Sequence, residues 1–300
     1  MHIGSELIKG SIVVGTDFSG ASQAVVEYAA KLARVESKPL YLAYIMPIIP
    51  EDSLPLLDIQ EDELRLRVEK AAKDLNGSGV TAEGILVMGS AAHELIKIAD
   101  KLDASYIVIG TEGFGGLDRL LLGSVAEAVI RKSDRPVIVV GPQAAKQSPK
   151  TLPWKHLMLA YDTASGVTEA ARLAGNVAVH HHAHLTIFNV RKEGIDNPSE
   201  EQFDAIERMM SREAWLTVKP QCLIRAGEPA KEIIRMVEDN QTDLLIMSVH
   251  SGGELLTHLH GGIIAKVLRM ARCPAMILRD LPSAHHDRKA HPAGHPTAID

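Results

Sequence analysis

Residues 105–140 read SYIVIGTEGFGGLDRLLLGSVAEAVIRKSDRPVIVV, a pattern that is informative about the fold class. The stretch begins with the short apolar run Ile107–Ile109 and ends with a second one, Val137–Val140. A glycine-containing segment and the helical pattern AEAVIRKS lie between these two runs. Short β-branched runs separated by a helix are typical of strands that are buried on both faces of a parallel sheet.

The same alternation extends in both directions along the chain. Further apolar strands are predicted at Ile12–Val14, Leu40–Ile45, Lys155–Ala160, Leu185–Val190, Cys222–Arg225, Leu244–Met247 and Ala275–Leu278. Amphipathic helices are predicted after Ser19, over Leu64–Leu75 and over Ala92–Leu102. This order predicts an α/β fold with open, doubly wound parallel sheets flanked by helices. Ligands of such sheets bind beyond the carboxyl ends of the strands, which here are Gly15–Asp17 and Gly110–Gly113.

The sequence contains an internal duplication. IVVGTDFS at 12–19 matches LMLAYDTAS at 157–165, and VMGSAAHELIKIADKLDASYIVIG at 87–110 matches IRAGEPAKEIIRMVEDNQTDLLIMS at 224–248. Asp17 precedes Asp162 by 145 positions and Gly89 precedes Gly227 by 138, so the first half carries seven extra residues, which we place in 46–58. The sequence predicts domains over 1–143 and 153–280, with a linker at 141–153 and a disordered, histidine-containing tail at 281–300.

Composition limits the partners and the compartment. The chain has 300 residues and a net charge of -6, which argues against a general nucleic-acid binder. No apolar run approaches the ~18 residues of a membrane span, and the N-terminus lacks the pattern of a signal peptide. Cys222 and Cys273 have no metal-ligand spacing and are expected to be small buried residues. We therefore expect a cytoplasmic protein with reduced thiols.

The glycine segment has the spacing G-x2-G-x9-G-S. Gly110 and Gly113 let the backbone pass close to a ligand and adopt positive φ angles. Gly123 and Ser124 stand at a helix start, where free amides attract phosphate and the Ser124 hydroxyl caps the helix or binds a phosphate oxygen. Arg119 lies inside the loop and is placed to close over a polyphosphate.

The wider pattern narrows the kind of phosphate site. Asp17 follows the first strand and is placed to accept a hydrogen bond from a ribose or to help hold Mg²⁺. The chain has no GxxxxGK[ST] P-loop, and GxGxxG is absent after the first strand. A loop with an ordinary helix cap, without any ligand, remains the alternative interpretation of these glycines.

In combination, VVGTDFS, GLDRLLLGSVAEAVIRKSDRPVIVV and the glycine spacing resemble the universal stress protein family in its tandem two-domain form. The resemblance covers nearly all of 8–143 and 153–280. It implies a five-stranded parallel sheet of order 3-2-1-4-5 in each domain, ATP binding by members with this glycine pattern, and dimers formed partly through the last strand. Carried onto this chain, the adenine and ribose side is Gly15, Thr16, Asp17 and Tyr44. The phosphate side is Gly110, Gly113, Gly123, Ser124 and Val125.

Two departures from the family pattern are expected to affect ATP binding. Glu112 stands where ATP-binding members often have His, and a carboxylate facing a triphosphate is repulsive unless Mg²⁺ or Arg119 offsets it. In the second half, Ser248 and Ser251 replace glycines and Gly262 replaces the capping serine, so this half is expected to bind ATP weakly or not at all.

The histidines leave two interpretations open. The consecutive His180, His181 and His182 are expected to point around a helix and to lie at the surface or at its cap, with no metal site. The alternative is a metal or anion pocket in the second half. Further histidines considered for that pocket are His184, His250, His258 and His260.

Three functions remain open. The first is a regulatory module or adaptor that holds ATP with Mg²⁺ in the first half and works with an unknown protein partner. The second is a slow ATPase or phosphotransferase in which Asp17 holds Mg²⁺ and Ser124 accepts or orients phosphate. The third is a structural interaction protein without nucleotide. In each case the halves are expected to pack as an intrachain pseudo-dimer, and two chains can form a homodimer.

Overall fold

The computed structural model describes residues 10–48, 54–111, 122–146, 152–161, 169–191, 219–250 and 262–280. Of residues 54–60, 250 and 280 only the backbone is described. No helix in these ranges is long and apolar enough to cross a membrane.

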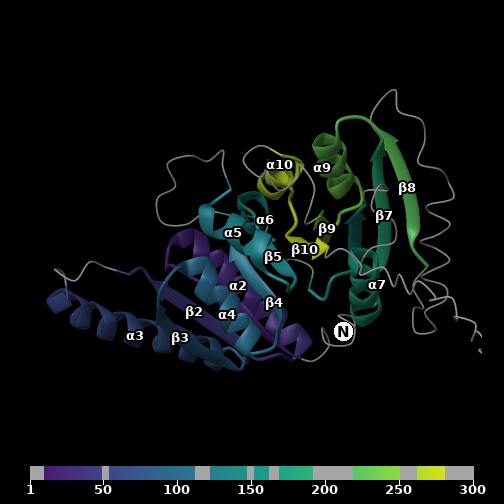
Figure 1. Ribbon diagram of the computed structural model, residues 1–300. Helices are drawn as coiled ribbons and strands as arrows, with labels where there is room; N and C mark the ends of the chain where they lie inside the picture. The colour runs from purple at the N-terminus through teal and green to yellow at the C-terminus, as the bar shows by residue number, and fades with distance from the viewer. Residues whose placement is uncertain are drawn as a thin grey trace, which may run out of the picture.

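Strands and helices alternate along both halves of the chain (Figure 1). The first half contains β1 (Ser11–Gly15), α2 (Gly20–Glu36), β2 (Leu40–Met46), α3 (Leu54–Gly77), β3 (Ala82–Met88), α4 (Ala91–Lys101), β4 (Ala104–Gly110), α5 (Ser124–Lys132), β5 (Val137–Val140) and α6 (Pro142–Lys146). The second half contains β6 (His156–Ala160), α7 (Glu169–His181), β7 (His184–Arg191), β8 (Gln221–Ala226), α9 (Pro229–Asp239), β9 (Leu244–His250), α10 (Ile263–Met270) and β10 (Ala275–Asp280).

The strands form one sheet of ten, in the order β3-β2-β1-β4-β5-β10-β9-β6-β7-β8. Within each half all pairs are parallel and follow the order 3-2-1-4-5, so the predicted fold class is confirmed. The halves join where β5 and β10 pair antiparallel, with Val139 opposite Ala275. Each half therefore covers the edge that the other would expose, which is the intrachain pairing predicted from the sequence.

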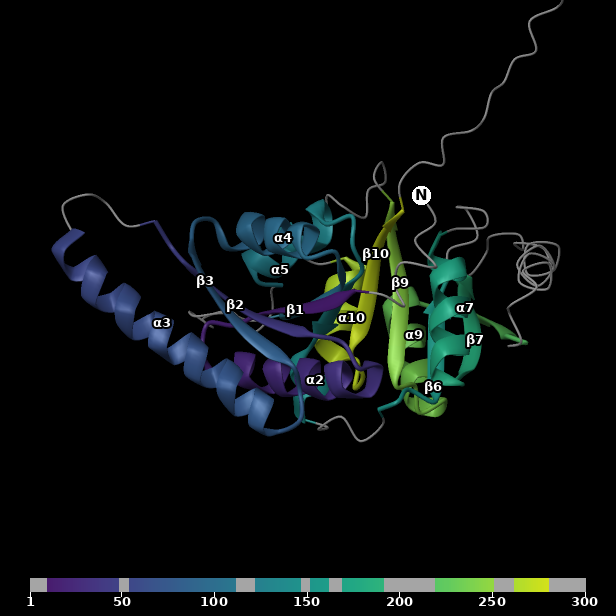
Figure 2. The same ribbon diagram turned by 90° about the horizontal axis from the view of Figure 1, so that it is seen from below.

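Helices cover both faces of the sheet. In Figure 2, α2 lies on one side of the first-half strands, and α4 and α5 lie on the other. The apolar clusters follow the same division across both halves. Leu32 of α2 and Leu173 of α7 belong to one cluster, whereas Leu95 of α4 and Val267 of α10 belong to the other. Both clusters contain residues from the two halves, so the halves share a continuous core.

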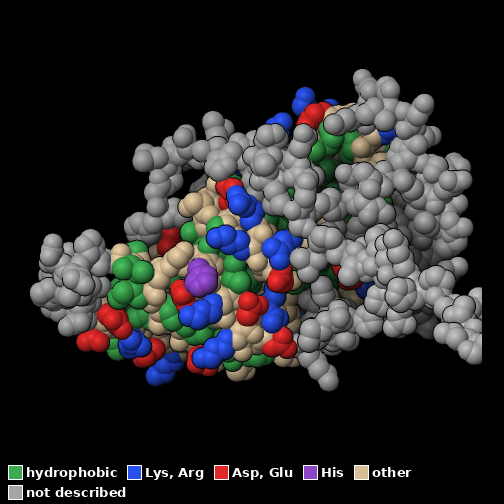
Figure 3. Space-filling model, viewed as in Figure 1, with side chains coloured by type: hydrophobic (Ala, Val, Ile, Leu, Met, Phe, Trp, Pro, Cys, Tyr) green, Lys and Arg blue, Asp and Glu red, His purple; other side chains and the backbone are tan. Residues whose placement is uncertain are grey.

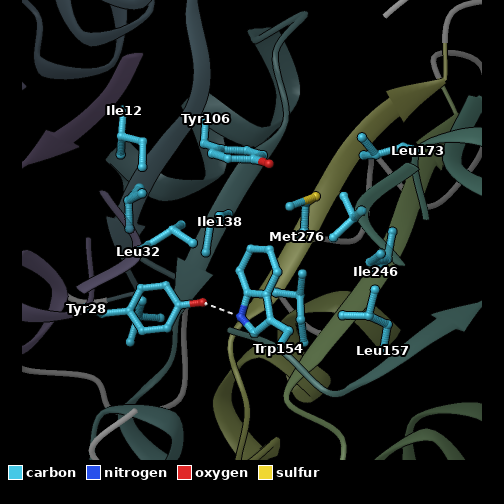
Figure 4. Packing of buried hydrophobic residues seen from close by; sticks show 14 of the residues in the cluster. Ile12, Tyr28, Leu32, Tyr106, Ile138, Trp154, Leu157, Leu173, Ile246 and Met276 are labelled. Atoms are coloured by element: carbon cyan, nitrogen blue, oxygen red, sulfur yellow. Dashed lines mark hydrogen bonds between the residues drawn. The ribbon is translucent and has the colours of Figure 1, made fainter. Parts of the chain in front are cut away.

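Trp154 occupies the centre of this shared core. Its side chain is buried, and its indole nitrogen donates a hydrogen bond to the hydroxyl of Tyr28 at 3.2 Å. Figure 4 shows Trp154 between first-half residues such as Leu32 and Ile138 and second-half residues such as Leu157. A buried indole is stable in such a place because its N–H has a partner.

Part of the stretch predicted as a linker is structured. It contains α6, and Ala144 of that helix is buried. The backbone at Gly141 passes so close to α10 that a Cβ there would lie 1.9 Å from the carbonyl oxygen of Leu268. Glycine is therefore needed at this position for packing against the other half rather than for flexibility. The tail at 281–300 lies outside the described residues.

Candidate functional site

The predicted site lies where β1 and β4 end. These strands are parallel neighbours, with Val14 opposite Val108, so both run toward the same edge of the sheet. Gly15 is the last residue of β1 and Gly110 the last of β4. The three heavy atoms nearest to a Cβ on Gly15 would be side-chain atoms of Leu95 and Ile109, at 3.4 Å or more. The two segments that carry the predicted site residues are therefore adjacent.

A turn stabilised by side chains follows β1. The amide of Thr16 donates to the carbonyl of Ala43 at 3.0 Å, which keeps this residue next to β2. The hydroxyl oxygen of Thr16 accepts from the amide of Phe18 at 3.0 Å, and Asp17 Oδ1 accepts from the amide of Ser19 at 2.9 Å. Phe18 has a φ of 58°, a left-handed conformation that is uncommon for a large residue. These bonds hold the turn in place.

The carboxyl group of Asp17 is ionised at neutral pH. Burial acts to raise its pKa, but hydrogen bonds from Ser19 and Ser22 outweigh burial and lower the pKa below its usual value. The side chain is also held at one oxygen by the Ser19 amide. The chain thus presents an oriented negative acceptor at the carboxyl end of β1.

An aromatic pair that sequence reasoning missed lies next to Asp17. The rings of Phe18 and Tyr44 are stacked, with centroids 5.3 Å apart, and the guanidinium of Arg67 in α3 lies 4.3 Å from the Phe18 centroid. The family resemblance implies that Tyr44 stands at the end of the second strand, but it lies inside β2, which continues to Met46. Phe18 belongs to the VVGTDFS motif and was available to sequence reasoning, whereas nothing in the spacing connects Arg67 to this turn.

At the start of α5 the glycine has a different role from the one predicted. Gly123 is the N-cap residue, with a φ of −60°, so it does not use a left-handed conformation. Its amide donates to the carbonyl of Thr111 at 2.9 Å and is therefore not free for phosphate. A Cβ on Gly123 would lie 2.9 Å from that carbonyl oxygen, so the glycine allows α5 to approach the end of β4 closely.

The next two residues present polar groups to solvent. Ser124 is the first residue of α5 and not its cap, so the predicted capping by its hydroxyl is wrong. Ser124 and Val125 are both exposed. Within the described ranges, no acceptor bonds their amides, as expected for the first turn of a helix. These N–H groups lie at the positive end of the helix dipole. Gly113, Arg119 and Glu112 lie outside the described residues.

The second half has a different arrangement at the corresponding edge. The amide of Tyr161 donates to the carbonyl of Phe188 at 2.8 Å, as Thr16 does to Ala43, so Tyr161 stands in the place of Thr16. Its side chain is buried. Asn189 follows Phe188, as Tyr44 follows Ala43, and it is buried and donates to the carbonyl of Tyr161 at 2.8 Å. A larger side chain at one position and a smaller, hydrogen-bonded one at the other therefore give this edge a different arrangement. Asp162, Ser251 and Gly261 lie outside the described residues.

Several other residues considered from the sequence are placed as follows. Cys273 is buried, and burial raises its pKa to about 12, so its thiol stays protonated at neutral pH. Cys222 is half-buried, and the two cysteines form no disulfide with each other. His182 and His184 are exposed, but His181 is buried, so the expectation that all the consecutive histidines lie at the surface or cap is wrong for that residue. His258 and His260 lie outside the described residues.

The surface over α4 and α5 is of mixed charge. Figure 3 shows basic and acidic side chains next to one another on this face. The ion pairs there include Lys97 with Glu94 at 3.4 Å and Arg131 with Glu127 at 3.7 Å. Such alternation compensates charge locally, so this face does not form the uniform positive stripe that nucleic-acid phosphates require.

Comparisons with known proteins agree on one family. The model of the universal stress protein family matches residues 10–141 and 153–279. A universal stress protein of Methanocaldococcus jannaschii is 33% identical over 144 residues, which are 46% of this chain and 84% of the relative. A universal stress protein of Mycolicibacterium smegmatis is 28% identical over 294 residues, which are 89% of this chain and 96% of the relative.

The comparison of structures shows the same fold. The chain is similar to the crystal structure of a universal stress protein from Archaeoglobus fulgidus, with a TM-score of 0.71 and 20% identity. The match covers 90% of this chain and 99% of that one, so the two-domain arrangement is shared over its length.

Proposed function

Because the chain belongs to the universal stress protein family, we propose that its first half binds ATP, with Mg²⁺, as a regulatory ligand. The tandem then acts as a stress-response module rather than as an enzyme. The observation that carries this proposal is the pairing of an ionised, oriented Asp17 at the end of β1 with the amides of Ser124 and Val125 beyond the neighbouring strand β4.

The two groups suit the two ends of a nucleotide. An ionised carboxylate accepts hydrogen bonds from ribose hydroxyl groups, and the ring pair Phe18–Tyr44 beside Asp17 offers an apolar surface for a base. Amides at a helix start favour phosphate oxygens through hydrogen bonds and through the helix dipole. Gly110, Gly113 and Arg119 are proposed to complete the phosphate side, and Gly123 is proposed to let α5 approach closely enough to place its amides there. Mg²⁺ is proposed to offset the charge of the phosphates beside Asp17 and Glu112.

The second half is proposed to have lost nucleotide binding. Tyr161 and Asn189 replace Thr16 and Tyr44 at its edge, and the buried amide of Asn189 is engaged by the Tyr161 carbonyl. The expected stoichiometry is therefore one ATP per chain. We further propose that the protein works in the cytoplasm, since its two cysteines form no disulfide with each other.

The test uses a charge placed at the start of α5. Ser124→Asp adds a carboxylate to the first turn of the helix, which stabilises the helix by about 0.3–1 kcal/mol but repels phosphate. We expect equilibrium dialysis with radiolabelled ATP to show at least a tenfold loss of affinity for this variant, with no loss of folding stability. Pro229→Asp is the matched control, because it adds the same charge to the first residue of α9 in the other half.

Each outcome decides between the three functions. Binding by the wild type and by Pro229→Asp, but not by Ser124→Asp, supports the proposal. Absence of ATP uptake below millimolar concentration, together with no adenine nucleotide copurified with the wild type, leaves a structural interaction protein. Steady ADP release that Asp17→Ala abolishes identifies a slow ATPase instead.

A further inference from the structure

A buried polar cluster lies where the two halves meet, apart from the nucleotide site. Glu36 ends α2 in the first half and His181 ends α7 in the second. Their side chains are 0% and 2% exposed, and His181 Nε2 lies 3.2 Å from Glu36 Oε1. Figure 1 shows α2 and α7 on either side of the joint between the halves. An acid and an imidazole therefore connect the halves at a buried place, beside the equally buried Lys38.

His180 brings a third ligand atom to this cluster. One ligand atom from each of Glu36, His180 and His181 lies within 4.8 Å of the other two. Adjacent positions on a helix differ by about 100°, so two long side chains can lean toward one point between them while a third cannot. The sequence-based expectation that these consecutive histidines diverge is thus wrong for His180 and His181. His182, which has a φ of 51°, is exposed.

The spacing of these atoms fits a tetrahedral ion. Zinc bonds of 2.0–2.1 Å place neighbouring ligand atoms about 3.4 Å apart. The 3.2 Å between His181 and Glu36 is close to this value. The exposed His180 ring needs to move by little more than about 1 Å to close the widest separation. His180 is exposed, so its side of the cluster leaves room for water as the fourth ligand of a tetrahedral ion.

The surroundings favour a cation at this place. Both α2 and α7 end here, so the negative ends of two helix dipoles point toward the cluster. Glu36 Oε1 faces His181 Nε2 at 3.2 Å, and this nitrogen can ligate an ion once its proton has moved to Nδ1 or has left the ring. The Trp154 ring packs on His181 with centroids 4.3 Å apart, which fixes the imidazole.

Lys38 determines which ions suit the cluster. Its ammonium lies 2.5 Å from Glu36 Oε2 and 4.6 Å from the centroid of the Tyr106 ring. It therefore neutralises the carboxylate from one side and leaves Oε1 facing the histidines. Binding then depends on the two imidazole nitrogens, which suit Zn²⁺, Cu²⁺ or Ni²⁺ and not the oxygen-preferring Mg²⁺ or Ca²⁺.

We propose that Glu36, His180 and His181 form a site for a divalent ion of the zinc class, and that the bound ion clamps the two halves of the tandem together. The two halves contribute different ligands, so neither half alone contains the site. The clamp acts at the joint and is independent of ATP at the carboxyl end of β1.

The test is zinc binding by the full chain. The tail histidines His285, His286, His291 and His295 are first replaced by Asn in every sample, because they bind metals adventitiously. Calorimetry with ZnCl₂ then compares this background with His180→Ala and with the matched control His182→Ala. Both replaced side chains are exposed, so neither change disturbs the core. Glu36→Gln in the same background tests the carboxylate.

We expect His180→Ala and Glu36→Gln each to lose at least about a hundredfold in affinity for one Zn²⁺, whereas His182→Ala retains it. Zinc at about a hundred times its Kd should raise the Tm of the matched control His182→Ala by a few degrees and leave the Tm of His180→Ala unchanged. Equal stoichiometry, affinity and thermal shift for His180→Ala and His182→Ala would overturn the proposal. Preference for Mg²⁺ over Zn²⁺ would overturn the assigned ion class.

Discussion

Replacing Gly123 by alanine should displace α5 from the end of β4. The new Cβ would lie 2.9 Å from the carbonyl oxygen of Thr111. A comfortable contact between carbon and oxygen begins at about 3.3 Å, so the helix start has to move by about 0.4 Å. The atom in the way belongs to the backbone, which cannot rotate aside as a flexible side chain would. The 2.9 Å hydrogen bond from the Gly123 amide to the same carbonyl limits this movement.

Two terms contribute to the expected loss. Overpacking at a close contact costs about 1–3 kcal/mol. Alanine is also a poorer N-cap residue than glycine, which adds roughly 0.5–1 kcal/mol. Gly123→Ala should therefore lower the free energy of unfolding by roughly 1.5–4 kcal/mol, measured by urea denaturation followed by circular dichroism. The same displacement moves the Ser124 and Val125 amides, so ATP binding should weaken as well.

The matched control is Gly20→Ala at the start of α2. A Cβ at Gly20 has no atom within 4 Å, so the same substitution meets open space. Alanine is the better helix former, and the variant should equal the wild type or exceed it by up to about 1 kcal/mol. A Gly123→Ala protein as stable as Gly20→Ala would refute the close approach of α5 to Thr111.

Three further changes test other parts of the molecule. Gly141→Ala places a Cβ 1.9 Å from the Leu268 carbonyl oxygen. The free energy of unfolding, measured by urea denaturation, should fall by about 3 kcal/mol or more. A loss below about 1 kcal/mol contradicts the packing of α10 on the first half. Tyr28→Phe leaves the buried Trp154 N–H without its acceptor and should cost about 1–3 kcal/mol, whereas an unchanged midpoint argues against that hydrogen bond. Asp17 has a lowered pKa, so its contribution to stability is present above its unfolded pKa of about 3.9 and is lost as the pH falls further. Asp17→Asn should therefore lose less stability than the wild type between pH 5 and pH 3, and parallel pH profiles would reject this assignment.

The alternation of apolar runs and amphipathic segments was sufficient to predict the doubly wound parallel fold, whereas the strand order came from the family resemblance and the duplication from the match between the two halves. Buried strands such as β4 and β5 carry their pattern locally, in β-branched residues without polar interruptions. Gly123 was predicted to contribute a free amide, whereas in the structure it allows α5 to pack closely against Thr111. This role could not be predicted because the distance to Thr111 depends on how α5 packs. Arg67 was missed for the same cause, since its contact with Phe18 depends on the path of α3.

The pairing of Glu36 with His181 is a long-range contact that the periodicity of the sequence could not predict. The two residues lie 145 positions apart. Their contact exists only because β5 and β10 join the halves antiparallel. Sequence periodicity describes each helix alone, so it assigned His181 to the surface, while the neighbouring half buries it.

The separation of 145 residues between Glu36 and His181 is also the repeat distance of the duplication, so the two occupy the same position in their respective halves. Ser37 and His182, which follow them, share a left-handed conformation with φ of 54° and 51°. Two identical subunits joined in this way would bring each residue against its own copy at the rotation axis. Two Glu36 carboxylates would then repel in a buried place, so the first half expressed alone should not self-associate through this face. Within the tandem the two copies differ at this position, so an acid meets an imidazole where a symmetric dimer would place two acids.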